Sequence, residues 1–88
     1  MSELDDAFAK AQQDVNTLSK KPDNDTLLFL YAHFKQATVG DASGKRPGAF
    51  DFVGKAKFGA WEDLKGTSGD AAKQAYVDKV SALLAADA

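Results

Sequence analysis

Hydrophobic residues near the N-terminus recur at helical spacing, and this periodicity restricts the fold more than any other feature of the chain. The spacings are four, three, four and three residues, which place one apolar stripe on an amphipathic helix. Ser2 precedes the stripe, and with an acid three residues later it predicts a capping box that uses the shorter acid. The stripe consists of Leu4, Phe8, Ala11, Val15 and Leu18.

A second helix is predicted after a clear turn signal. The segment KPDND at residues 21–25 interrupts the periodicity, because its proline disfavours helical backbone at the residue before it. Asp23 or Asn24 can cap the helix that follows. We expect this helix to run from about residue 25 to residue 39 and to end at Gly40, which can adopt the left-handed conformation of a C-terminal cap.

Two more helices are predicted after a long connection. Residues 40–50 (GDASGKRPGAF) hold three glycines and one proline and show no apolar periodicity. Asp51 is the expected N-cap of the third helix, and Gly66 is expected to close it. Ser68 is expected to cap the fourth. The predicted fold class is therefore all-α, a four-helix domain with one long loop between helices 2 and 3.

Length and composition limit the possible functions. A chain of 88 residues can hold one modest core, so we expect a single domain over residues 1–88. The absence of cysteine excludes a disulfide framework, a cysteine-based zinc site and a thiol nucleophile, and it favours a reducing compartment such as the cytoplasm. The acidic first residues are not those of a signal peptide, and no segment approaches the ~20 apolar residues of a membrane span. We expect a soluble protein without stable membrane insertion.

Positive charge is concentrated in the middle of an acidic chain. Residues 35–57 carry five lysines and arginines against two aspartates, which is +3, and the other residues carry six against eleven acids, which is −5. A local positive field on an acidic body suits a small anion better than nucleic acid, which the rest of the surface would repel. A solvated lysine-rich loop is the alternative, and it explains most charge clusters of this kind.

Catalytic and metal-binding patterns are missing from the sequence. The chain has one histidine, and it has no serine–histidine–aspartate arrangement, no histidine or cysteine cluster and no phosphate-binding glycine motif. We therefore expect neither an enzyme nor a bound metal or cofactor. Tyr31, Phe34 and Lys35 share one helical surface, and Lys57 and Tyr76 can converge on the same cavity to make a nucleotide site. Burial in the core is the alternative for Phe34 and Tyr76.

Several strings resemble the acyl-CoA-binding protein family. They are KKPDN at 20–24, LYAHFKQATVGD at 30–41, RPGAFDFVGKAKFGAW at 46–61, LKGTS at 64–68 and AYVDKV at 75–80. The resemblance implies a four-helix bundle of up-down-down-up topology. It also implies binding of medium- to long-chain fatty acyl-CoA esters without altering them, and a role as a monomeric intracellular carrier that meets acyl-CoA-using enzymes transiently.

The resemblance also implies which residues bind the ligand. Tyr31 and Lys35 match the pair that meets the adenine and 3′-phosphate end, Lys57 matches a second 3′-phosphate lysine, and Tyr76 matches a tyrosine that contacts CoA. Ala32 and His33 lie within the same string and are included in the expected site. An acyl groove between the first two helices would be lined by Phe8, Ala11, Leu27 and Leu28.

Four positions depart from the family pattern. Phe34 replaces a usual tyrosine, so it can stack on adenine but cannot offer a hydroxyl. Phe58 replaces a usual tryptophan, and Val53 and Asn16 stand where some members carry a lysine. A protein-interaction module that uses the same basic and aromatic face is the alternative function, and a thioesterase is disfavoured because no nucleophile and base are paired.

Overall fold

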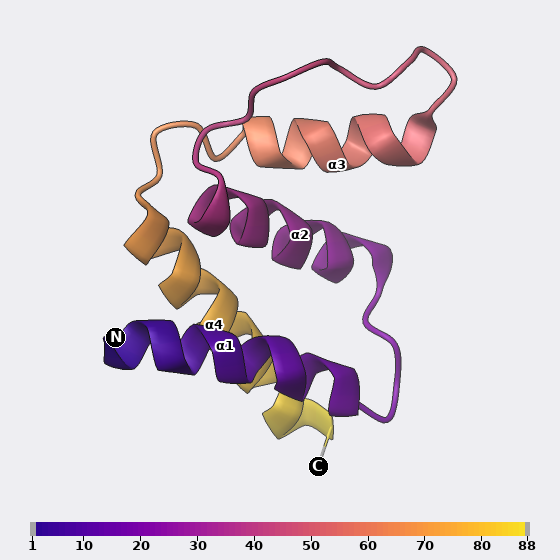
Figure 1. The fold of residues 1–88 in the computed structure, drawn as a ribbon. Coiled ribbons are helices and arrows are strands. Elements are labelled where there is room, and N and C mark those ends of the chain that lie inside the picture. Colours follow the sequence, from indigo (N-terminus) through magenta and orange to yellow (C-terminus); the bar gives the residue numbers. More distant parts are fainter. Residues whose placement is uncertain (1, 88) are drawn as a thin grey trace.

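The computed structural model describes residues 2–87, and within that range the chain forms four α-helices and one short 3-10 helix (Figure 1). Helix α2 runs opposite to α1, α3 runs in the same direction as α2, and α4 crosses back. The predicted all-α fold with a long connection before the third helix is confirmed. The elements are α1 (Glu3–Asp14), η1 (Val15–Thr17), α2 (Asn24–Thr38), α3 (Phe52–Glu62) and α4 (Gly69–Asp87).

Each α-helix begins with a short polar side chain that accepts a hydrogen bond from a backbone N–H three residues later, as the sequence predicted. This satisfies one of the N–H groups that the first turn of a helix leaves unpaired. The donor–acceptor pairs are Asp5 N–H to Ser2 at 3.0 Å, Thr26 N–H to Asp23 at 2.8 Å, Gly54 N–H to Asp51 at 2.9 Å and Ala71 N–H to Ser68 at 3.1 Å.

Two helix ends differ from the expected positions. The apolar stripe of the first segment continues to Leu18, but α1 ends at Asp14 and a 3-10 turn carries the chain onward. Helix α3 ends at Glu62, several residues before Gly66, because the N–H groups of Leu64 and Lys65 bond to carbonyls only three residues back. Such bonds tighten the last turn of a helix. Gly66 then adopts the left-handed backbone expected of it, with φ of 88°.

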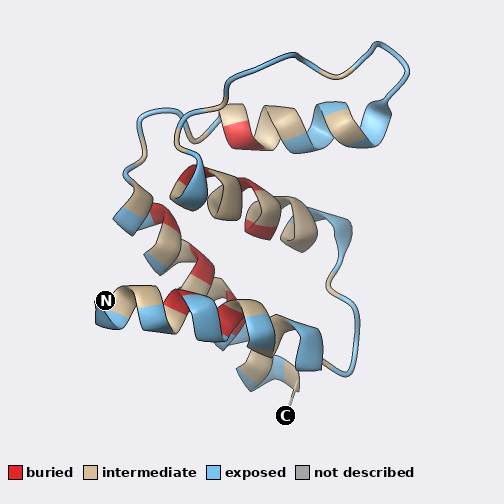
Figure 2. Cartoon of the chain, in the orientation of Figure 1, coloured by how far each residue is buried: buried red, intermediate tan, exposed pale blue. Residues whose placement is uncertain are grey.

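The core is built from α1, α2 and α4, and Figure 2 shows its buried residues gathered where these helices face one another. Phe8 is central: its ring centre lies 5.1 Å from that of Tyr76 in an edge-to-face arrangement and 6.0 Å from that of Phe34. Leu30 and Val80 belong to the same cluster. Helix α4 packs on both α1 and α2, whereas α3 packs on α2. Helix α3 is therefore an addition to the core rather than part of it.

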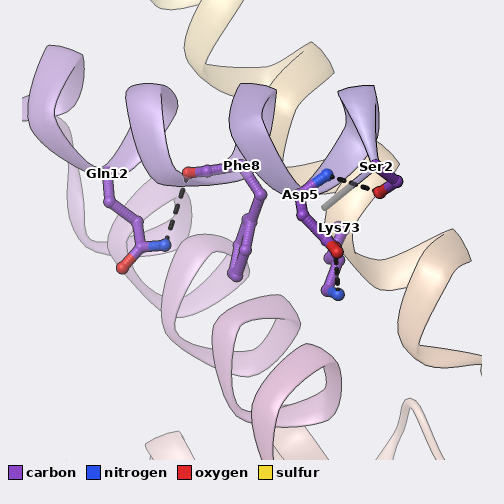
Figure 3. Close-up of polar contacts among 5 residues, drawn as sticks. All are labelled: Ser2, Asp5, Phe8, Gln12 and Lys73. Atoms are coloured by element: carbon purple, nitrogen blue, oxygen red, sulfur yellow. Dashed lines mark hydrogen bonds and ion pairs between the residues drawn. The ribbon is translucent and has the colours of Figure 1, made fainter.

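One ion pair links the first turn of α1 to the beginning of α4. The Lys73 ammonium donates to the Asp5 carboxylate at 2.5 Å, joining α4 to the first turn of α1 (Figure 3). The hydrogen bond from Lys73 lowers the pKa of Asp5, and the same bond raises the pKa of Lys73. The pair stabilises the side of the molecule that carries α1 and α4.

Candidate functional site

Helix α2 carries the aromatic and cationic residues of the expected site, and α3 meets them. The Lys57 ammonium on α3 lies 5.2 Å from the ring centre of Tyr31 on α2, which is within range of a cation–π contact. Two residues that are 26 positions apart in the sequence thereby come together across the two helices. The contact leaves a cationic group and a phenol side by side.

The second lysine of the expected site lies closer to the end of α2. The Lys35 ammonium is 5.0 Å from the centre of the Trp61 ring. Trp61 is buried, and its indole N–H donates a 2.7 Å hydrogen bond to the Gly40 carbonyl. Trp61 therefore holds the C-terminal end of α3 against the end of α2, and its ring contacts the Lys35 ammonium.

A buried amide fixes the position of α3 relative to α2. Gln36 is 2% exposed, and its Nε2 donates to the Asp41 carboxylate and to the Thr67 carbonyl, each at 2.8 Å. The same Asp41 oxygen accepts a 2.9 Å bond from the Gly66 N–H. These bonds join the end of α2, the start of the long loop and the turn between α3 and α4. We call this group the Gln36 cluster.

The Gln36 cluster makes stability sensitive to acid. The Gly66 N–H, followed by the Gln36 amide, lowers the pKa of Asp41 below its ordinary value. As the pH falls, the Asp41 carboxylate is therefore protonated in the unfolded chain before it is protonated in the folded protein. The contribution of Asp41 to folding stability is complete above about pH 5 and is lost as the pH falls below about 4. We expect the difference in unfolding free energy between wild type and Asp41→Asn to shrink on moving from neutral pH to pH ~3. Urea titrations at the two pH values measure it, and a constant difference would contradict the assignment.

The long loop is attached to the outer side of α3. Arg46 pairs with Glu62, and its guanidinium lies 5.3 Å from the centre of the Phe58 ring. Both partners are on α3. Arg46 thus attaches the loop to α3. Because its guanidinium is occupied by these contacts, Arg46 is not counted among the cations that can bind a ligand.

Three neighbouring cavities form a trench along α2. The α3 cavity, of about 490 Å³, is lined by Lys21, Asn24, Leu27, Leu28, Phe52, Val53, Ala56 and Lys57. The central cavity, of about 430 Å³, is lined by Val15, Asn16, Leu18, Lys20, Lys21, Pro22, Leu27, Leu30 and Tyr76. The aromatic cavity, of about 290 Å³, is lined by Gln12, Val15, Asn16, Leu30, Tyr31, Phe34 and Tyr76.

Shared walls make these cavities one continuous trench. Lys21 and Leu27 line both the α3 cavity and the central cavity. Leu30 and Tyr76 are among the residues that line both the central and the aromatic cavity. The α3 end of the trench combines apolar side chains with Lys21 and Lys57, and the other end offers aromatic rings. The contact of Lys57 with Tyr31 links the two ends. Such a surface can hold an elongated molecule with a flat ring, an anion and an aliphatic part.

The structure brings most of the expected site residues into the trench. Tyr31, Phe34 and Tyr76 line its aromatic end, and Leu27, Leu28 and Lys57 line its α3 end. Tyr76 serves in the core as well, which was the alternative fate considered for it. Burial raises the pKa of Tyr76, so its hydroxyl stays a neutral hydrogen-bond donor at physiological pH.

Five expected residues do not line the trench: Lys35, which contacts Trp61, and four others. Phe8 and Ala11 are only 6% and 4% exposed and belong to the core cluster, so the wall facing Leu27 and Leu28 comes from α3 rather than from α1. Ala32 is 2% exposed. The His33 ring stacks on Phe29, 4.0 Å between centres, and its Nδ1 lies 2.7 Å from the Phe29 carbonyl oxygen. Core packing accounts for the burial of Phe8, Ala11 and Ala32. Contacts within α2 account for the position of His33.

The sequence alone did not identify the α3 wall of the trench. Phe52 and Val53 are apolar residues of the predicted third helix that were not among the expected site residues, and they are 74% and 67% exposed. Gln12 of α1 was not singled out, because a polar residue in an amphipathic helix gives no signal of a site.

The fold and the trench together define a small helical ligand-binding protein. Comparison with known proteins agrees with this class. The family model for acyl CoA binding protein matches residues 5–80. The chain is 51% identical to acyl-CoA-binding protein homolog 1 of Caenorhabditis elegans over 79 residues, covering 90% of this chain and 92% of the relative. The chain belongs to the acyl-CoA-binding protein family.

Solved structures show the same fold. The crystal structure of Oryza sativa acyl-CoA-binding protein 2 superposes with a TM-score of 0.88 at 35% identity and covers 94% of this chain and 92% of that chain. The crystal structure of the protein ACBP from Moniliophthora perniciosa gives a TM-score of 0.87 at 45% identity and covers 99% of this chain and 84% of that chain. The relatives are thus similar along nearly their whole length.

Among residues 2–87, none of the helices combines the length and the apolar character that a membrane span requires. No group of three or more histidine, cysteine, aspartate or glutamate side chains in that range could hold a metal ion.

Proposed function

We propose that the chain binds medium- to long-chain fatty acyl-CoA esters in the trench and releases them unaltered. The observation that carries the proposal is the continuity of the trench, which joins an aromatic cavity to a cavity of about 490 Å³ whose walls combine apolar side chains with Lys21 and Lys57. An acyl-CoA ester has the same order of parts: an adenine ring, phosphates and an aliphatic tail. Family membership supports this ligand over other anions with a flat ring.

The nucleotide end of the ligand would lie at the aromatic cavity. Phe34 and Tyr31 offer ring faces to adenine, and the Lys57 ammonium beside Tyr31 can donate charge-assisted hydrogen bonds to a phosphate. The neutral Tyr76 hydroxyl is available as a further donor. Lys35, on the same helix as Tyr31, would add a second cation from the end of α2.

The acyl tail would lie in the α3 cavity, against Leu27 and Leu28 on one side and Phe52 and Val53 on the other. This moves the expected groove from between α1 and α2 to between α2 and α3. Val53 offers a methyl surface where some members of the family carry a lysine, so it adds apolar contact and removes a charge. Val53 would therefore strengthen binding of the acyl tail and weaken binding of the phosphates.

Affinity should therefore increase with acyl length until the α3 cavity is filled. Each buried CH₂ group contributes up to ~0.8 kcal/mol, which is roughly a fourfold change in the dissociation constant. We expect palmitoyl-CoA to bind far more tightly than octanoyl-CoA, and octanoyl-CoA more tightly than free CoA. Isothermal titration calorimetry across the series measures this. Equal affinity for free CoA and palmitoyl-CoA would refute the proposal.

A carrier role follows from binding without chemistry. The single histidine, His33, packs on Phe29 outside the trench, so no base accompanies the thioester there. We propose a monomeric, cytoplasmic pool former, a single domain over residues 1–88, that exchanges ligand transiently with acyl-CoA-using enzymes. Native mass spectrometry of the purified protein tests this against a protein-interaction module: a bound acyl-CoA mass supports the carrier, and a bound peptide supports the module.

A further inference from the structure

The last residue of α4 is bonded to the connection between η1 and α2. The Asp87 carboxylate accepts two hydrogen bonds from the Ser19 N–H, to Oδ1 at 3.1 Å and to Oδ2 at 3.2 Å. The Ser19 hydroxyl donates a third, to Oδ1 at 2.6 Å. The two residues are 68 positions apart, and Figure 1 shows the C-terminal end of α4 beside the connection between α1 and α2. We call these bonds the Asp87 contact.

The Asp87 contact is charge-assisted. Hydrogen bonds to an ionised carboxylate are shorter and stronger than those between neutral groups. The Ser19 hydroxyl and then the Ser19 N–H lower the pKa of Asp87, and the N–H and charge of Lys20 act in the same direction. The carboxylate is therefore ionised at neutral pH, and the contact has its full strength there.

The segment that Asp87 holds is a wall of the trench, and we call residues 18–22 the trench loop. Four of its residues line the central cavity: Leu18, Lys20, Lys21 and Pro22. Ser19 is the fifth residue of the trench loop, and it bonds to α4 instead of lining a trench cavity. Asp87 is not among the lining residues of these cavities either. Asp87 is therefore connected to the trench through Ser19.

Few other bonds fix the trench loop. Among residues 2–87, no backbone–backbone hydrogen bond outside the helices involves residues 19–22. The side chains of Lys20 and Lys21 belong to exposed residues, so packing does not hold them. Asp23, the residue after the loop, caps α2. A segment with few buried contacts opens easily unless a specific contact holds it, and the Asp87 contact is the one that joins this segment to α4.

We propose that Asp87 is a positioning residue, which holds the trench loop in the arrangement that completes the wall of the central cavity and thereby raises the affinity for the ligand. This inference rests on the proposed function, because it concerns the same trench. When only a fraction of the molecules has the competent arrangement, the apparent dissociation constant increases by the inverse of that fraction. Loss of the Asp87 contact should therefore weaken binding, although Asp87 does not line the trench.

The direction of the effect separates positioning from electrostatics. An acyl-CoA ester is an anion, so removal of an acid should strengthen its binding slightly through the long-range field. Removal of the Asp87 charge is expected to do the opposite. Asp78→Asn is the matched control: Asp78 is an exposed residue of α4, and its carboxylate accepts a 2.8 Å bond from Gln74 on the same helix. Asp78 lies roughly 14 Å before Asp87 along the helix.

Calorimetry with palmitoyl-CoA tests the effect on the trench. We expect Asp87→Asn to weaken binding about fivefold to tenfold, and Asp78→Asn to bind at least as tightly as wild type. Ser19→Ala should weaken binding by less than Asp87→Asn, because the backbone bonds remain. Asp87→Glu keeps the carboxylate and should recover most of the affinity. Circular dichroism confirms that each variant is folded, so that a change in affinity reports the trench.

Nuclear magnetic resonance of the ligand-free protein tests the contact itself. The Ser19 N–H should exchange with solvent faster in Asp87→Asn than in wild type, because it loses its charged acceptor, whereas amides in the middle of α1 and α2 should exchange as before. Equal exchange of the Ser19 N–H in the two proteins would overturn the proposal.

The proposal would also be overturned if Asp87→Asn bound palmitoyl-CoA as tightly as Asp78→Asn does. That result is distinct from a failure of the proposed function. In the first case wild type binds palmitoyl-CoA and the two variants do not differ, whereas in the second wild type itself does not bind.

Discussion

Replacing Lys57 by alanine is expected to weaken palmitoyl-CoA binding by roughly 10- to 100-fold. A hydrogen bond to a charged group contributes about 1.5–3 kcal/mol, and Lys57 is the cation that lies in the trench beside Tyr31. Lys35→Ala should weaken binding in the same direction. Calorimetry on the folded variants measures both effects, and circular dichroism confirms that the helices remain.

The chain offers a matched control for these lysines. The Lys79 ammonium lies 5.5 Å from the centre of the Phe29 ring, so Lys79→Ala removes one positive charge and one cation–π contact away from the trench. Its affinity should stay close to wild type. The acyl ester of 3′-dephospho-CoA should bind wild type more weakly than palmitoyl-CoA, with little further loss in Lys57→Ala. If Lys57→Ala remains as sensitive to removal of that phosphate as wild type, Lys57 does not meet it.

Replacing Phe8 by alanine is expected to lower the free energy of unfolding by about 3–5 kcal/mol. Phe8 is 6% exposed, and its ring contacts Phe34 and Tyr76, so truncation would leave a cavity where α1, α2 and α4 meet. A domain of this size has a total stability of roughly 5–10 kcal/mol, so the variant would be close to unfolding. Guanidinium chloride titration followed by circular dichroism measures the midpoint.

Phe50→Ala is the matched control for Phe8→Ala. It makes the same chemical change at a side chain that is 90% exposed, where substitutions usually alter stability by less than about 0.5 kcal/mol. Equal midpoints for the two variants would contradict the central place of Phe8 in the core.

Local signals predicted the helices well. Capping by Ser2, Asp51 and Ser68 depends on residues three positions apart, and the left-handed turns at Gly40 and Gly66 depend on the absence of a Cβ atom. The apolar stripe of α1 and the end of α2 follow from the same short-range geometry. Spacing along one helix was also enough to place Tyr31, Phe34 and Lys35 on a common surface.

Contacts between helices could not be predicted in the same way. Phe52 and Val53 are apolar residues of the predicted third helix, and the sequence does not indicate whether they are covered. Among residues 2–87, the helix that α3 packs on is α2, and its N-terminal turn is exposed. The contacts that set this position join distant parts of the chain, as in the bond of Gln36 with Thr67 and that of Trp61 with Gly40. No fixed spacing in the sequence marks such partners.

By itself, the sequence determined four capped helices, a long connection and the aromatic and cationic surface of α2, because helical geometry relates residues three and four positions apart. Only the tertiary structure decided that α3 rather than α1 faces Leu27 and Leu28, that Phe8 and Ala11 are buried in the core, and that Lys57 reaches Tyr31. The physical reason is that these arrangements depend on which helix faces cover one another, and that is settled by the packing of the whole chain.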